Sequence, residues 1–143
     1  MAFKFEQLDV WQLSLEYSDL IYELANQLPE HEKFNLRSQI IRAATSISLN
    51  IAEGSTGQSD AEQNRFLGMA VRSLIETVAC QRMIARRNYV TDKYFLEKID
   101  KKAQELAKRL FSFRKALTLH NRSIGEEPAL YETDLFEESP KSE

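Results

Sequence analysis

The chain has 143 residues, of which 43% are hydrophobic and 29% charged, as in an ordinary globular domain that can bury a core. We expect neither a secretory signal nor a membrane span, because the sequence has no apolar stretch at its start and no uninterrupted apolar run of about 18 residues. A single cysteine excludes an internal disulfide and favours a cytoplasmic protein.

The net charge of −3 combines three unlike segments. Residues 1–64 hold four Lys or Arg and ten Asp or Glu, whereas residues 65–122 hold fourteen and five. Residues 123–143 hold one Lys and seven acidic residues. Because electrostatic fields act locally, the basic middle segment matters more for binding than the overall charge does.

Hydrophobic periodicity predicts four helices. The first is expected over residues 8–28, where Pro29 ends it. The second is expected over residues 34–53, with Gly54 as its left-handed C-terminal residue.

A line of polar side chains runs along this second helix. Its members stand three or four residues apart and so share one face: Gln39, Arg42, Ser46, Asn50 and Glu53. The other faces are apolar or small, so we expect a buried helix whose polar line forms a structural network, with Arg42 paired to Glu76. The alternative is a ligand pocket that uses Arg42, Asn50 and Glu53.

The third helix is expected to begin at a capping box, Ser59 with Glu62, and to reach about residue 88. The fourth is expected from residue 91 or 92 to about 120, with an apolar seam at alternating spacings of three and four: Leu96, Ile99, Ala103, Leu106, Leu110, Phe113 and Leu117. Short connections between long helices favour an all-α, antiparallel, up-down-up-down four-helix bundle over residues 1–122.

Residues 123–143 change character. They are acidic and contain two prolines, so we expect a flexible, disordered tail. Its scattered apolar residues could still dock on a surface: Leu130, Tyr131, Leu135 and Phe136.

The stretch QIIRAATSISLNIAEG, residues 39–54, resembles the hallmark of a bacterial family of four-helix-bundle proteins, first noticed as products of intervening sequences in 23S ribosomal RNA genes. The positions that match are Gln39, Arg42, Ala43, Ser46, Asn50, Ile51, Ala52, Glu53 and Gly54. In the third helix, Ser73, Leu74 and Glu76 are similar to the family pattern, whereas Arg72 stands where the family usually has Gly. The likeness spans roughly residues 5–120.

The resemblance implies a homo-oligomer, with five copies as the expected number. Related accessory proteins of diversity-generating retroelements, similar in fold, bind a reverse transcriptase and nucleic acid through a basic surface. Those relatives are strongly basic, whereas this chain has a pI near 5.5. Because of this difference in charge, we treat nucleic-acid binding as a lead that the resemblance suggests and not as a property carried over from those relatives.

No catalytic constellation emerges from the sequence. His31 and His120 stand at helix ends and are expected to be surface residues, and Cys80 is expected to be a small buried hydrophobe. The stretch 54–59 lacks the Lys of a phosphate-binding loop and is expected to form a capped turn. Because no Glu-x-x-His pair occurs, a di-iron site of that type is excluded. We expect no enzyme, no metal site and no cofactor.

The excess of Lys and Arg in the third and fourth helices is the best functional lead. One interpretation is a solvated face, balanced by the acidic first helix and tail; the other is a polyanion-binding surface. The candidate residues are Arg82, Arg86, Arg87, Lys98, Lys101, Lys102, Lys108 and Arg109. We expect a non-catalytic oligomeric module that binds RNA or DNA. The alternative is an adaptor that binds a protein partner through its acidic tail.

Overall fold

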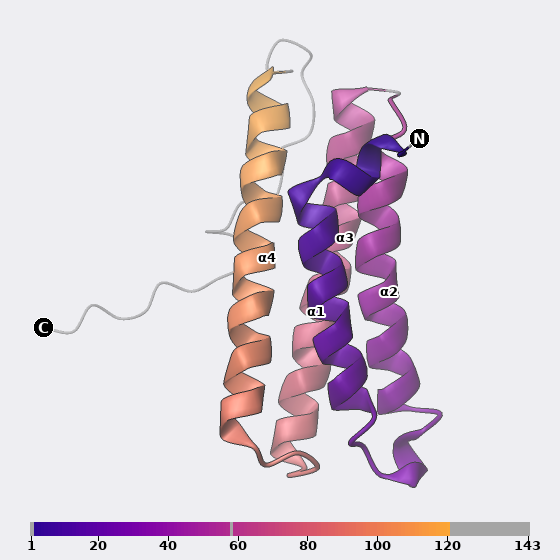
Figure 1. The fold of residues 1–143 in the computed structure, drawn as a ribbon, viewed down its shortest axis with the longest axis vertical. Helices are drawn as coiled ribbons and strands as arrows, with labels where there is room; N and C mark the ends of the chain where they lie inside the picture. Colours follow the sequence, from indigo (N-terminus) through magenta and orange to yellow (C-terminus); the bar gives the residue numbers. More distant parts are fainter. Residues whose placement is uncertain (1, 58, 121–143) are drawn as a thin grey trace, which may run out of the picture.

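The computed structural model describes residues 2–57 and 59–120. Its long helices are α1 (Asp9–Ala25), α2 (Leu36–Gly54), α3 (Asp60–Arg86) and α4 (Lys93–His120), with 3-10 turns η1 (Lys4–Gln7) and η2 (Glu30–Glu32). Successive helices stand side by side and run in opposite directions (Figure 1). The described chain is an all-α, up-down-up-down four-helix bundle, as predicted, and the expected tail lies outside the described residues.

Local side-chain chemistry explains where the later helices begin and end. The Ser59 hydroxyl accepts a hydrogen bond from the backbone N–H of Glu62 at 3.0 Å, which confirms the predicted cap of α3. After α3, Asn88 adopts a left-handed conformation with φ of 58°, which asparagine tolerates better than most residues. The Asp92 carboxylate then accepts from the backbone N–H of Phe95 at 3.1 Å, so α4 also begins at a capped turn.

Gly54 has a different role from the one predicted. It does not end α2 in a left-handed conformation: the helix runs through it, and among the described glycines only Gly57 has a positive φ. Gly54 is buried where α2 meets the start of α3, and a Cβ atom at this position would lie 2.9 Å from the Cβ of Phe66. The glycine therefore permits the close approach of two helices.

The core runs along the bundle axis and draws on all four helices. Its largest fully buried side chains are Tyr17, Ile21, Leu24, Ile40, Ile47, Ile51, Leu67, Leu74, Ile84, Ile99, Leu106 and Leu110. Cys80 is buried at 4% exposure, and burial raises the pKa of its thiol above the usual value. The prediction of a small buried hydrophobe is confirmed.

One polar cluster lies inside this core, and sequence periodicity alone gave no sign of it. The hydroxyl of Tyr17 is 2.8 Å from that of Thr77, which in turn donates to the Leu74 carbonyl at 2.6 Å. The Gln81 side-chain amide donates to the Tyr17 oxygen at 2.6 Å. Burial raises the pKa of Tyr17 well above its ordinary value, so the phenol stays neutral and fastens α1 to α3 across the bundle.

We predict that Tyr17→Phe lowers the free energy of unfolding by about 1–3 kcal/mol, because the buried Gln81 amide loses its acceptor. Urea denaturation followed by circular dichroism measures the change. The double variant Tyr17→Phe/Gln81→Leu should recover part of the loss, because it removes both partners. Tyr22→Phe, at a residue 45% exposed, is the matched control and should be neutral. A Tyr17→Phe variant as stable as the parent would contradict this role.

Candidate nucleic-acid interface

The polar line of α2 is not buried. Gln39, Arg42 and Glu53 are exposed, whereas Ser46 and Asn50 are half-buried beside α3. Leu49, the residue before Asn50, is itself 56% exposed, so an apolar side chain also faces outward here. The expectation of a helix buried on every face is therefore wrong.

The predicted pair between Arg42 and Glu76 is also wrong. Glu76 instead accepts a hydrogen bond from the Gln39 side-chain amide at 2.9 Å. The Arg42 guanidinium lies 3.5 Å from the Ser38 hydroxyl, one turn earlier in its own helix. Arg42 therefore faces solvent, where an arginine needs no buried partner.

A smaller network remains on this face. The Ser73 hydroxyl of α3 donates to the Ser46 hydroxyl at 3.0 Å. The Asn50 amide donates to the backbone carbonyl of Ser46 at 2.9 Å and lies 3.1 Å from its hydroxyl. Ser46 thus links α2 to α3.

The alternative ligand pocket corresponds to a depression of about 370 Å³ lined by α2 alone: Arg42, Thr45, Ser46, Leu49, Asn50 and Glu53.

Three of the candidate basic residues are held by carboxylates. The ion pairs join Arg82 to Asp100 at 2.8 Å, Lys102 to Glu16 at 3.2 Å and Arg109 to Asp9 at 3.9 Å. The first links α3 to α4, and the other two link α4 to the acidic α1. The carboxylates offset these three charges, so these residues are poor candidates for phosphate binding.

The other five candidates have no carboxylate within 4.0 Å among the described residues: Arg86, Arg87, Lys98, Lys101 and Lys108. All five are exposed. Arg87 nevertheless lies close to Glu32 at the end of the bundle. The pKa of the Glu32 carboxyl is lowered chiefly by a hydrogen bond from the Asn35 amide and further by the charges of His31 and Arg87.

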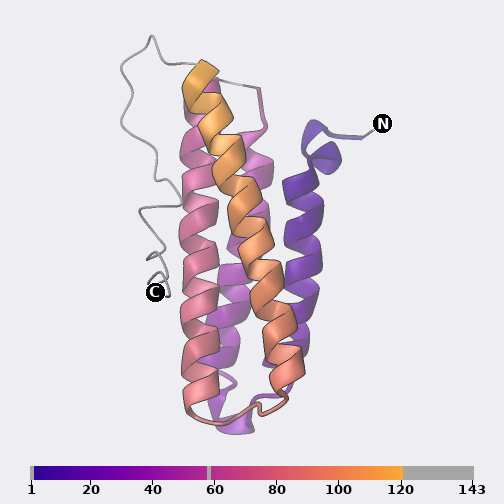
Figure 2. The ribbon, with the colours of Figure 1, turned by 90° about the vertical axis from the view of Figure 1, so that its left-hand side faces the viewer.

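Helical spacing extends the set of unpaired cations to two residues that the candidate list missed. Lys115 stands seven residues after Lys108, which itself stands seven after Lys101, so the three share the outward face of α4. Arg72 stands fourteen residues before Arg86 on the outward side of α3. Both missed residues are exposed, and α3 and α4 run side by side (Figure 2). Their spacing of seven or fourteen residues from a candidate residue indicates, from sequence alone, that they share its helix face. We call this set the outer basic face: Arg72, Arg86, Lys101, Lys108 and Lys115.

Arg114 does not belong to that face, because it is only 8% exposed. Its Nε donates to the side-chain oxygen of Asn64 at 2.7 Å, and the Asn64 amide donates to the Thr118 hydroxyl at 3.2 Å. The guanidinium lies against Gly68, where a Cβ atom would come within 2.9 Å of Nη2. Arg114 therefore packs α4 on α3, and its burial makes it a poor candidate for binding a ligand.

The histidines are exposed, as predicted. The His31 Nε2 is 3.1 Å from the Tyr89 hydroxyl, and His120 bonds to the Asp60 carboxylate. Over residues 2–57 and 59–120, no three His, Cys, Asp or Glu side chains gather in a way that could hold a metal ion. None of the helices in the described ranges is long and apolar enough to cross a membrane.

The sequence pattern of the 23S rRNA-intervening sequence proteins matches residues 6–112 of this chain. The chain belongs to that family. Its fold is similar to the crystal structure of a protein of unknown function from the S23 ribosomal protein family of Bacteroides thetaiotaomicron, with 33% sequence identity and a TM-score of 0.68. The similarity covers 74% of this chain and 98% of the other. No curated protein matches the chain.

Family membership confirms the resemblance seen in the sequence. The matched range contains the whole polar line and most of the outer basic face, but it ends at residue 112, before Lys115. The solved relative has unknown function, so an activity for this family member must be argued from its own residues.

We predict that Arg42→Ala changes the free energy of unfolding by less than about 0.5 kcal/mol, as is usual for exposed positions. Ile40→Ala, two residues earlier and fully buried, should instead cost about 2–5 kcal/mol. Urea denaturation of both variants checks the contrast. A loss of several kcal/mol in the Arg42 variant would restore the buried pair.

Proposed function

We propose that this chain is a non-catalytic, cytoplasmic binding module that binds RNA or DNA through its outer basic face. The observation that carries the proposal is the difference between the two sides of α4. Cations that face α1 have acidic partners, whereas Lys101 and Lys108 on the outward face have no carboxylate within 4.0 Å in the described chain. Exposed, unpaired cations can exchange their counterions for phosphate oxygens, which drives binding to nucleic acid.

The arrangement supports recognition of the phosphate backbone and not of base sequence. Lys101, Lys108 and Lys115 follow one another at about 10 Å along the axis of α4, given a rise of 1.5 Å per residue. Such rows of cations can track a backbone without reading base edges. Tyr94, 80% exposed, stands seven residues before Lys101 and so shares this row, where its ring could stack on a base of any sequence, whereas Phe111 is buried and Phe113 half-buried. Binding should therefore depend steeply on salt and weakly on sequence.

We propose no catalytic role, because neither described histidine is hydrogen-bonded to a Ser, Thr or Cys side chain that it could activate. The Cys80 thiol is buried with its pKa raised. His31 contacts Tyr89, and His120 contacts Asp60. The adaptor alternative depends on residues 123–143, which lie outside the described residues, so no observation in the bundle favours it.

We predict that Arg86→Glu/Lys101→Glu lowers affinity for a labelled RNA hairpin by about ten-fold or more at low salt, because phosphate contacts are lost. The slope of log affinity against log salt should also become shallower by about one for each lost contact. Fluorescence anisotropy over a salt series, with a duplex DNA in parallel, measures both. Lys4→Glu/Lys33→Glu makes the same change of charge at exposed residues away from the face. Equal losses in the two double variants would mean that only net charge matters and would contradict the proposed face.

We further propose that several copies assemble, with five as the number that the resemblance implies. Assembly would repeat the outer basic face and convert a weak single contact into an avid one. Light scattering coupled to size-exclusion chromatography should therefore give a mass of five chains. A monomeric mass across the working concentrations would refute the assembly.

A further inference from the structure

Helix α4 extends well beyond the helix it packs on. It has 28 residues against 17 in α1. Asp9, the first residue of α1, lies opposite Arg109 of α4, their charged atoms 3.9 Å apart. From Arg109 to His120, α4 therefore continues for about 16 Å past the start of α1. Figure 2 shows α4 leaving α1 and leaning toward α3 at this end, and Figure 1 shows the segment before α1 turning away from α4.

The apolar seam of α4 continues into this overhang, past the start of α1 and beside α3. The buried positions near its end shift to Ala107, Phe111 and Arg114, on the side that faces α3. Phe113 and Leu117, the last two seam residues, are only half-buried. An apolar seam that runs past the end of one of its partner helices leaves part of its surface available for another apolar segment.

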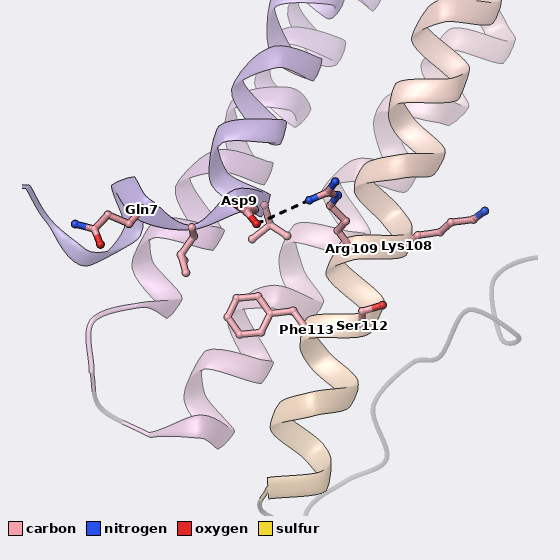
Figure 3. Close-up of a pocket in the computed structure, with 8 residues that line it drawn as sticks. Gln7, Asp9, Lys108, Arg109, Ser112 and Phe113 are labelled. Atoms are coloured by element: carbon pink, nitrogen blue, oxygen red, sulfur yellow. Dashed lines mark ion pairs between the residues drawn. The ribbon is translucent and has the colours of Figure 1, made fainter.

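The opening beside the overhang is a wedge of about 480 Å³. We call it the α1–α4 wedge, and its lining includes Leu8, Val10, Ser112 and Phe113. Figure 3 shows Phe113 and Arg109 pointing toward α1 and Lys108 pointing away from it. The wedge therefore combines an apolar floor with a charged rim, where Arg109 is paired with Asp9 and Lys108 has no carboxylate within 4.0 Å in the described chain. It fits a peptide segment that alternates apolar and acidic residues.

We propose that residues 130–136 of this same chain, LYETDLF, occupy the α1–α4 wedge. The segment has two apolar pairs, Leu130–Tyr131 and Leu135–Phe136, and between them stand two acidic residues, Glu132 and Asp134. The apolar pairs bury against the wedge floor, while the carboxylates reach Lys108, the rim cation that has no described carboxylate within 4.0 Å.

Chain connectivity favours this occupant. The chain continues from residue 121 to residue 143 directly after α4 ends at the overhang. The residues between His120 and Leu130 can span up to about 33 Å, well over the roughly 10 Å back along α4 to Phe113. A tethered segment also meets its site at an effective concentration of about 1 mM, which a free partner rarely reaches. The family match ends at residue 112, so Phe113, Leu117 and the segment all lie beyond the matched range.

Docking would also influence the outer basic face. The segment would place carboxylates near Lys108 and Lys115, where they compete with nucleic-acid phosphates. This consequence, unlike the docking itself, rests on the proposed function.

A fluorescence experiment on the full chain tests the docking. Ser112→Cys places an exposed thiol at the wedge for a bimane label, while the native Cys80 is buried and should stay unlabelled. Phe136→Trp adds a quencher to the segment. We expect bimane emission to fall by roughly half or more relative to the labelled chain that keeps Phe136, because the tether keeps the contact populated. The matched control carries the label at Glu97→Cys, exposed near the other end of α4, and should not change. Equal emission from the two chains labelled at the wedge, with and without Phe136→Trp, would overturn the proposal.

Two further arms identify the cause of quenching. Lys108→Glu/Arg109→Glu should restore the emission of the label at the wedge, whereas Lys98→Glu/Lys101→Glu should not, although both change the charge equally. Mixing the labelled chain that keeps Phe136 with an unlabelled Phe136→Trp chain detects docking between copies. Quenching found only in that mixture would overturn an intramolecular contact.

The link to nucleic acid has its own readout. Leu135→Asp/Phe136→Asp should release the segment and raise RNA affinity at low salt by roughly ten-fold, by freeing phosphate-binding cations. Quenching without a change in RNA affinity would keep the docking and overturn its effect on the face. Absence of RNA binding in every variant would instead overturn the proposed function and leave the quenching result standing.

Discussion

Each helix of this bundle has to bury one apolar stripe, and the lengths of the helices decide where that is achieved. Along most of the axis all four stripes meet around residues such as Ile21, Ile47, Leu74 and Leu106. At the end where α1 begins, the last turns of α4 extend past α1 and pack on α3. There the buried contacts include a polar one, the hydrogen bond of Arg114 to Asn64, beside apolar residues such as Phe111. Because α1 is shorter than α4, the wedge beside Phe113 stays open.

The same arrangement of helices decides which cations are available. The acidic α1 lies beside one flank of α4, so its carboxylates hold Lys102 and Arg109. Among the described residues, no acidic helix lies on the opposite, outward flank, and its lysines are exposed. A chain with a negative total charge can therefore present a basic surface, because charges of opposite sign are separated by the bundle itself.

The polar line of α2 shows how a motif can be informative about ancestry and misleading about packing. It identifies the family, yet Arg42 and Glu53 point to solvent. The line joins α2 to α3 through two hydrogen bonds, from Gln39 to Glu76 and from Ser73 to Ser46. The close approach of those helices depends at least as much on Gly54, because any side chain there would meet Phe66.

Sequence by itself determined the four helices, their order, the cap at Ser59, the buried Cys80 and the family, since these follow from local spacing and local chemistry. It also located the basic segment. Tertiary structure alone decided which side of α2 faces outward, because periodicity shows which residues share a face but not which helix covers it. It likewise decided which cations meet acids, and that Tyr17 meets Gln81 across the core. The open wedge beside α4 depends on where α1 begins opposite its partner, which is a property of two helices packed together and of neither sequence segment alone.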